Sequence, residues 1–173
     1  MFLNILLIVL GLGILALSVT IILHIFLPVP YVPTPHKIVE RMVELAEFKG
    51  DEIVHDLGAG DARLLIAAKR RYPGLTVRGC EVVPTIWFLG KLRSWWSRVP
   101  VDLCCGSIER ADVRDADVIF LYLIPSLMAK LEKKFDLELR EGTRVISSAF
   151  TFPTKKEVYS EMVWGKKVFV YEW

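Results

Sequence analysis

The stretch DLGAGDAR, from Asp56 to Arg63, is the part of the sequence whose residue types and spacing best suit chemistry. It stands at the end of the strand predicted over residues 52–57 and leads into a helical pattern that starts at Ala62. Glycines at the carboxyl end of a strand let a ligand approach the backbone without meeting a Cβ atom. The same glycines could serve only a tight turn, so the loop alone leaves both interpretations open.

Glu81 is the second chemical component, because it ends the next predicted strand about 20 residues beyond the loop. A carboxylate at that place can accept hydrogen bonds from both ribose hydroxyls of a nucleotide. A dinucleotide site would have a third glycine where this chain has Ala62, and the acidic Asp61 is unfavourable beside a pyrophosphate. Asp56 and Asp61 instead suit the cationic amino and sulfonium groups of S-adenosylmethionine. The pattern favours S-adenosylmethionine over a dinucleotide.

The elements that must position these residues alternate between strands and helices. Apolar runs predict five strands, over residues 52–57, 75–81, 101–105, 117–123 and 143–150. Helical patterns separate them, and Thr34 is predicted to cap an additional first helix that begins at Pro35. The segments 157–163 and 168–173 predict a closing antiparallel hairpin. The expected fold is α/β, with a mostly parallel seven-stranded sheet and a C-terminal antiparallel hairpin.

Residues 5–27 contain no Asp, Glu, Lys or Arg and are long enough to span a bilayer as a helix. A cleaved signal peptide and a buried core helix are the competing interpretations. The non-basic start and the proline-rich end favour an uncleaved anchor. Because His36, Lys37 and Arg41 follow the segment and no positive side chain precedes it, the positive-inside rule predicts a single-pass protein whose domain faces the cytoplasm. We therefore expect an anchor and its exit at residues 1–30 and a folded domain at 31–173.

Several segments together resemble a known family. DLGAGDAR with Glu81 is similar to the first two cofactor motifs of class I S-adenosylmethionine-dependent methyltransferases, and Gly106-Ser107 resembles their adenine-side motif. More specific are YVPTP, FLYLIPSLMAKLEKKF and GTRVISSAFTFP, which begin at residues 31, 120 and 142. With the N-terminal anchor, they resemble the membrane-associated protein-lysine methyltransferases that modify the ATP synthase c-subunit and the adenine nucleotide translocase, and their prokaryotic relatives.

The resemblance implies a Rossmann-like class I methyltransferase fold and a set of cofactor residues. Asp56, Gly58, Ala59, Gly60 and Asp61 would line the methionine and ribose part, Glu81 would hold the ribose, and Ser107 would lie near the adenine. The chain departs from the family at Ala62, where glycine is usual, and at Ser107, where an acid is common. Alanine in a first helical turn and a serine that still hydrogen-bonds should preserve binding.

The exit segment, residues 31–35, follows the anchor and has a predicted role of its own. Thr34 and Pro35 start a helix just before the first strand, so the segment can fold over the carboxyl ends of the sheet. We expect Tyr31 and Thr34 to touch the cofactor or to close the substrate mouth.

Methyl transfer from a sulfonium needs a positioned acceptor and no nucleophilic side chain. A lysine acceptor must be neutral, which an apolar pocket, the sulfonium charge or a proton-accepting side chain can favour. Tyr122 is the candidate catalytic residue because it ends the fourth strand, although it could also be a buried aromatic. Asp117 is expected on the far side of the sheet, and a set of three could form the opposite wall: Ser147, Ser148 and Phe152.

The helix predicted over residues 84–98 combines three tryptophans with three basic residues. This composition suits an interfacial helix as well as a core helix with a solvated face, and both remain open. The net charge of +2 gives no support for nucleic acid, and we expect none as a partner. The three cysteines lack metal-ligand spacing, so no metal is expected.

These observations lead to one hypothesis and two rivals. The chain is expected to be a membrane-anchored enzyme that moves a methyl group from S-adenosylmethionine to a lysine of a protein, with a membrane protein as the expected substrate. The anchor would contact the bilayer through residues 5–27. The rivals are methylation of a lipid headgroup or apolar small molecule, and a non-enzymatic cofactor-binding membrane scaffold.

Overall fold

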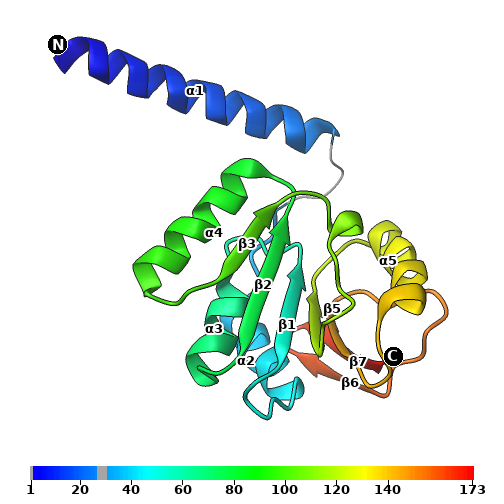
Figure 1. Cartoon of the computed structure of the whole chain (residues 1–173). Coiled ribbons are helices and arrows are strands. Elements are labelled where there is room, and N and C mark those ends of the chain that lie inside the picture. The colour runs from blue at the N-terminus through cyan, green and yellow to red at the C-terminus, as the bar shows by residue number, and fades with distance from the viewer. Residues whose placement is uncertain (1, 27–30) are drawn as a thin grey trace.

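A computed structural model describes residues 2–26 and 31–173 of the chain. Its centre is a seven-stranded sheet with the order β3-β2-β1-β4-β5-β7-β6 (Figure 1). The strands β1 to β5 pair in parallel, and β7 joins β5 and β6 in antiparallel fashion. The predicted fold of five parallel strands and a closing hairpin is confirmed.

The bounds of the elements follow the predicted runs closely. The strands are β1 (Ile53–Leu57), β2 (Thr76–Glu81), β3 (Asp102–Cys105), β4 (Val118–Leu121), β5 (Arg144–Ser148), β6 (Tyr159–Val163) and β7 (Lys166–Glu172). The helices are α1 (Phe2–Phe26), α2 (His36–Leu45), α3 (Arg63–Arg71), α4 (Pro84–Ser97) and α5 (Pro125–Glu138), with a short 3₁₀ helix, η1, at Ile108–Arg110.

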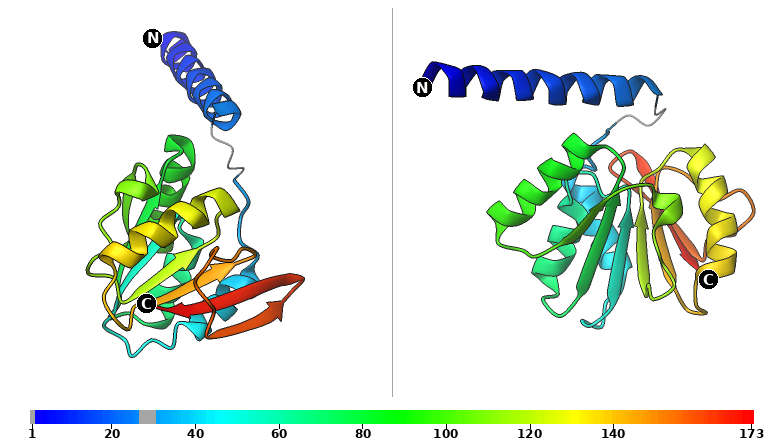
Figure 2. Two further views of the ribbon diagram at one scale, coloured as in Figure 1. Left: turned by 90° about the vertical axis from the view of Figure 1, so that its right-hand side faces the viewer. Right: turned by 45° about the horizontal axis from the view of Figure 1, so that its top comes forward.

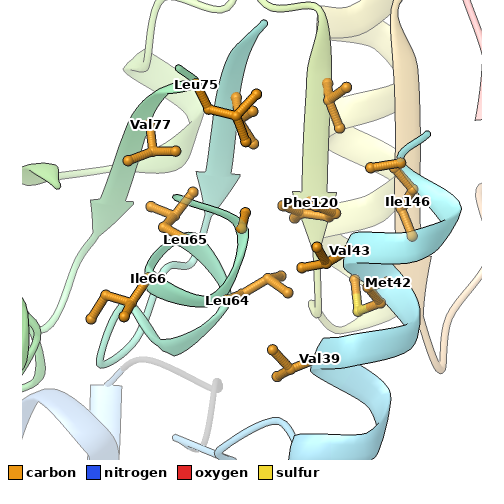
Figure 3. Close-up of a cluster of buried hydrophobic side chains, with 14 of the residues drawn as sticks. Val39, Met42, Val43, Leu64, Leu65, Ile66, Leu75, Val77, Phe120 and Ile146 are labelled. Carbon is orange, nitrogen blue, oxygen red and sulfur yellow. The ribbon is translucent and has the colours of Figure 1, made fainter. Parts of the chain in front are cut away.

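Two hydrophobic cores lie on opposite faces of the sheet. Side chains alternate along a strand, so Val118 and Phe120 of β4 join the core with α2 and α3, whereas Ile119 and Leu121 join the core with α5. Figure 3 shows the first core, where apolar side chains of α2 and α3 lie close to Phe120 on one face of the sheet. The views in Figure 2 show α5 on the other side. A β4 that is buried on both faces is the reason for its continuous apolar run.

The helix α1 stands apart from the sheet, and its described apolar side chains are exposed (Figures 1 and 2). It is 25 residues long, about 37 Å, and carries one window, Phe2–Val19, that is long and apolar enough to cross a membrane. A signal sequence near an N-terminus meets the same criterion. Leu27, Pro28 and Pro30, which the sequence assigns to the end of the anchor and its exit, lie outside the described residues.

Two local expectations were wrong. Thr34 does not cap α2: the helix begins at His36, its N-cap is Pro35, and no side chain caps it. Instead, the backbone N–H groups of Ile38 and Val39 donate to the Pro35 carbonyl. Ala62 is not inside the first turn of α3 but is its N-cap, in the left-handed conformation with φ of 61°. That conformation disfavours a Cβ atom, so it suits glycine better than alanine.

Candidate functional site

A pocket of about 570 Å³ opens at the carboxyl edge of the parallel strands, where ligands of open α/β sheets bind. That volume suits a small-molecule ligand. The structure brings all ten predicted site residues to its walls: Tyr31, Thr34, Asp56, Gly58, Ala59, Gly60, Asp61, Glu81, Ser107 and Tyr122. They come from the exit segment, β1 and its loop, β2, the loop after β3 and the end of β4.

The loop after β1 presents backbone to the pocket. Gly58 has φ of 90° and Gly60 has φ of 55°, which glycine adopts without strain. A Cβ atom on Gly58 would stand 2.9 Å from Cδ2 of Leu123, and one on Gly60 would stand 3.1 Å from Cε2 of Tyr31. The glycines therefore serve both the turn and the close packing of the pocket walls.

Glu81 ties this loop to the following one. One carboxylate oxygen accepts a hydrogen bond from the N–H of Gly60 at 3.0 Å, and the other accepts one from the N–H of Val83 at 2.8 Å. Each carboxylate oxygen has a second lone pair. The side chain is thus fixed in direction and can still accept hydrogen bonds from ligand hydroxyls.

Asp56, near the carboxyl end of β1, is a buried carboxyl group on the pocket wall. Within the part of the chain that the structure describes, it has no hydrogen-bond or ion-pair partner. Burial, with the nearby charges of Glu81 and Asp61, raises the pKa of Asp56 to about 8. A cation placed beside it would favour its ionised form.

Asp61 lies on the same wall, but its charge is already matched. Arg63 donates two hydrogen bonds to it, each at 2.8 Å, and Nη2 of Arg93 lies 2.9 Å from Oδ2. Although burial acts to raise the pKa of Asp61, the hydrogen bonds from Arg63 and the charge of Arg93 hold it below its usual range. Of the two acids expected to attract a cofactor cation, Asp56 is the one whose carboxyl group has no partner among the described residues.

The exit segment forms one wall of the pocket, as predicted. The Tyr31 ring packs over Gly60, and burial, with the neighbouring Asp61, raises the pKa of its hydroxyl. The carbonyl of Thr34 accepts a hydrogen bond from Nη1 of Arg63 at 3.0 Å. Arg63 thus links the exit segment to the glycine loop, a role that sequence reasoning missed. The available signal was a basic residue two positions after the loop acid Asp61.

Ser107 stands at the start of η1, where its hydroxyl accepts a hydrogen bond from the N–H of Glu109 at 3.3 Å. Glu109 lines the same part of the pocket and pairs with Lys130 at 2.8 Å. The pocket therefore has an acid, Glu109, two residues after Ser107.

Tyr122 directly follows β4 and lines the far end of the pocket, half-buried. Nζ of Lys166, in β7, donates a hydrogen bond to its hydroxyl. Lys166 was not predicted, because nothing in the local sequence shows that the closing hairpin reaches β4. Apolar side chains complete this end, among them Leu123, Leu127 and Phe150.

The predicted opposite wall is wrong in its residues. Ser147 and Ser148 are fully buried in β5, and Phe152 packs in the second core against Phe135 and Tyr171. Phe150, two residues before Phe152, is the one that lines the pocket.

Asp117 accepts a hydrogen bond from the N–H of Ile53 at the amino ends of the strands, away from the pocket, as expected. No group of three or more His, Cys, Asp or Glu side chains among residues 2–26 and 31–173 could hold a metal ion.

Comparison with known proteins decides what this pocket belongs to. Residues 56–159 match the family model described as the ANTKMT methyltransferase domain. The chain belongs to this methyltransferase family. It is 33% identical over 129 residues to a protein-lysine N-methyltransferase of Saccharolobus islandicus, with 70% of this chain and 77% of that protein covered. The family comprises S-adenosylmethionine-dependent protein-lysine N-methyltransferases.

Two mouse relatives extend the comparison. An adenine nucleotide translocase lysine N-methyltransferase is 33% identical over 135 residues, and an ATP synthase c-subunit lysine N-methyltransferase is 31% identical over 126 residues. The alignments cover 76% and 72% of this methyltransferase. The chain spans 58% and 50% of the length of these two relatives.

Solved structures include an RNA methyltransferase from Salinibacter ruber in complex with S-adenosyl-L-homocysteine. It superimposes with a TM-score of 0.78 at 31% identity and covers 82% of this chain and 93% of its own. The cofactor of the family is therefore S-adenosylmethionine, whose product is S-adenosylhomocysteine.

The pocket of this methyltransferase fits that cofactor by its own chemistry. A buried carboxyl group, Asp56, which has no partner among the described residues, suits a cationic amino acid moiety. The glycine loop, whose positive φ values at Gly58 and Gly60 favour glycine, presents backbone to the pocket and suits close approach of a ligand. An oriented carboxylate, Glu81, suits a ribose.

Proposed function

We propose that this chain transfers a methyl group from S-adenosylmethionine to the side-chain amine of a lysine in a membrane protein, while α1 anchors it in the bilayer. The observation that carries the proposal is a continuous pocket that joins Asp56 and Glu81 at one end to Tyr122 at the other. Residues 1–30 would serve as anchor and exit, and residues 31–173 as the methyltransferase domain.

The cofactor end of the pocket would hold S-adenosylmethionine through the residues that line it. Asp56 would pair with the amino group, the backbone of the glycine loop would lie against the amino acid and ribose parts, and Glu81 would accept from the ribose hydroxyls. Ser107 would lie by the adenine, and Tyr31 with Thr34 would cover the ligand from the exit segment. When bound, the cofactor supplies an electrophilic methyl group on a sulfonium.

The acceptor end must favour a neutral lysine amine. With a reference pKa of about 10.4, deprotonation at pH 7 costs about 4.6 kcal/mol. The apolar walls formed by Leu123, Leu127 and Phe150 would desolvate the ammonium and so lower its pKa. The hydroxyl oxygen of Tyr122 would then accept a hydrogen bond from the amine and so orient it.

The anchor supports a membrane-bound substrate for a geometric reason. Tyr31 lines the pocket and lies five residues beyond Phe26, the last residue of α1, so at most about 17 Å of chain joins them. A bilayer-spanning α1 would hold the pocket within that distance of the surface and would raise the local concentration of membrane substrates. The basic side chains of Lys37 and Arg41 favour a cytoplasmic domain.

The deciding experiment follows labelled methyl groups. The purified full-length chain would be incubated with labelled S-adenosylmethionine and its native membranes, after which protein, lipid and RNA are separated. We expect label in protein, on lysine, and its loss with the Glu81→Gln variant. Label only in lipid would refute the lysine acceptor in favour of a headgroup, and label only in RNA would refute it as well.

Two further measurements separate the components of the proposal. Calorimetry with S-adenosylmethionine should show binding, and its absence would overturn the enzyme assignment for this chain. Retention in the membrane after alkaline carbonate washing should show that α1 is an integral anchor, and complete release would overturn the anchor.

A further inference from the structure

Helix α4 has two faces of opposite character. Ile86, Gly90 and Ser94 are buried against the sheet. The other face exposes five large apolar side chains, which are Phe88, Leu89, Leu92, Trp95 and Trp96. Their spacing of three and four residues places them on one side of the helix. Trp95 and Trp96 are 73% and 82% exposed, so this face is a continuous apolar surface that the described part of the chain leaves uncovered.

The sequence left open whether the three tryptophans of α4 belong to the core or to an exposed surface, and the structure gives different answers for them. Trp87 packs against the first core, and its Nε1 donates a hydrogen bond to the carbonyl of Leu103 at 3.0 Å. Trp95 and Trp96 contact each other edge to face, with ring centroids 6.4 Å apart, and belong to neither core. The core explanation therefore holds for Trp87 alone.

Basic side chains border the apolar face of α4. Lys91 lies on one side of it and Arg93 on the other, as the helical angles of their positions require. A groove of about 950 Å³ runs along the helix, lined by Leu89, Leu92 and Trp96 together with four arginines, Arg63, Arg70, Arg93 and Arg98. Arg70 and Arg98 are exposed and have no ion-pair partner in residues 2–26 and 31–173.

We propose that the exposed face of α4 lies in the interfacial layer of a bilayer that contains anionic lipids. Exposed tryptophans with leucines on one face and basic residues at its borders are the composition of helices that lie at the headgroup level. Arginines at that level pair with lipid phosphates. A protein partner would need one surface that matches both an apolar face and a cationic border. An anionic bilayer matches both, because its acyl chains are apolar and its headgroups are negatively charged.

The position of α4 relative to the anchor favours the same surface. Arg93 pairs with Asp61, and the Cα of Gly90 lies close enough to the loop that a Cβ there would stand 3.1 Å from the Gly60 carbonyl oxygen. Tyr31 packs on that same Gly60, so the end of the exit segment and α4 meet at one loop. The inference rests on the proposed function, because it uses α1 as the anchor that holds this side of the domain near lipid.

Fluorescence quenching by brominated lipid tests the contact directly. The full-length chain is reconstituted into vesicles of phosphatidylcholine with phosphatidylglycerol, with and without bromine on the acyl chains. We expect brominated lipid to quench the emission of the native chain strongly. The variant Trp95→Phe with Trp96→Phe keeps the apolar face and should lose most of that quenching. The matched control, Trp164→Phe, removes an exposed tryptophan of the hairpin. The emission intensity that brominated lipid removes should be the same in this variant as in the native chain.

The opposite result would be equal fractional quenching in the native chain and the double variant. That outcome would overturn the inference, because Trp95 and Trp96 would then not contact lipid. A second measurement uses vesicles of phosphatidylcholine alone, where the loss of anionic lipid should weaken the quenching. Unchanged quenching there would overturn the role of the arginines.

Failure of this inference and failure of the proposed function give different results. A chain that resists carbonate extraction and methylates a protein lysine, but shows no quenching through Trp95 and Trp96, would refute only the α4 surface. A chain that carbonate releases, or that places no label on lysine, would refute the anchor or the reaction, whatever its quenching.

Discussion

Nζ of Lys166, at the start of β7, donates a hydrogen bond to the hydroxyl of Tyr122, directly after β4. The same ammonium lies 4.5 Å from the centroid of the Tyr122 ring. A hydrogen bond donated to the phenol oxygen fixes the position of the ring. The hydroxyl hydrogen of Tyr122 must then point to a different acceptor. The closing hairpin thus positions the residue that we assign to the acceptor end of the pocket.

The variant Lys166→Met should lower kcat several-fold, because one hydrogen bond of this kind contributes about 1 kcal/mol to the positioning of its partner. KM for S-adenosylmethionine should stay unchanged, since Lys166 is not among the described side chains that line the pocket. Steady-state kinetics on a protein substrate measures kcat and the KM for S-adenosylmethionine separately.

The matched control for that variant is Lys167→Met, which removes the neighbouring charge from a surface pair with Glu157 at 3.9 Å. Its kinetics should match those of the native chain. An increase of activity in Lys166→Met would contradict the positioning role, because it would mean that Lys166 competes with the acceptor lysine.

Cofactor affinity should depend on pH through Asp56. The pKa of this carboxyl group is about 8 in the free protein, so it is mostly protonated at pH 7. A bound cation lowers that pKa, and binding therefore releases a proton. The affinity should rise with pH up to about pH 8 and then level off. Calorimetry at pH 7 in buffers of different ionisation enthalpy measures the released proton, and the Asp56→Asn variant should not release it.

The stability of the free protein should depend on pH through the same group. Because the folded-state pKa of about 8 exceeds the ordinary aspartate pKa of 3.8, the folded state binds more protons than the unfolded state between these limits. The free energy of unfolding therefore decreases as pH rises through that window. The Asp56→Asn variant should be more stable than the native chain at pH 8, by on the order of a few kcal/mol, and nearly equal at pH 4. Urea unfolding in detergent checks the difference, and equal gains at both pH values would speak against it.

Tyr31 should contribute to cofactor binding through its ring. Replacing it with alanine removes the cover over Gly60 and should weaken binding by about 1 kcal/mol, roughly fivefold. The Tyr31→Phe variant keeps the ring and should bind nearly as well as the native chain. A chain that begins at Pro35 and retains full affinity and full activity on a soluble acceptor would reduce the exit segment to a spacer.

Glu81→Gln should weaken cofactor binding at least tenfold. A hydrogen bond to a charged group contributes about 1.5–3 kcal/mol, and the amide would present an N–H group to one of the two backbone donors that Glu81 accepts from. Glu172→Gln, at the far end of β7, is the control and should bind normally. Equal affinities in the two variants would remove Glu81 from the site.

The sequence predicted the strands well because their apolar runs are short, separated and bounded by turn residues. The continuous run at β4 indicated a strand covered on both faces, and Phe120 and Ile119 now lie in the two cores. The end of the pocket that we assign to the cofactor could be assembled from the sequence for a related reason. Asp56, Gly58 and Glu81 come from consecutive elements whose ends must meet at one edge of a parallel sheet.

The remaining features depend on contacts between distant segments. Arg63 and Arg93 neutralise Asp61 from different helices, and no local pattern shows that their side chains converge. Lys166 reaches Tyr122 over 44 positions of sequence, through a hairpin whose place in the sheet is set by pairing with β5. The residue type of Thr34 suits a cap, but its actual role, a carbonyl that accepts from Arg63, uses the backbone and leaves no mark in the residue type.

Gly90 gives the α4 helix a mechanical role. Its missing side chain lets the helix pack closely on the glycine loop, where a Cβ atom would stand 3.1 Å from the Gly60 carbonyl oxygen. If α4 lies at the bilayer surface as proposed, its depth and tilt would therefore affect the position of the loop that we assign to the cofactor. The packing of α4 on this loop, together with the pair of Arg93 with Asp61, would then help to set the height of the reacting methyl above the bilayer. That height would decide which lysines along a membrane protein the enzyme can reach.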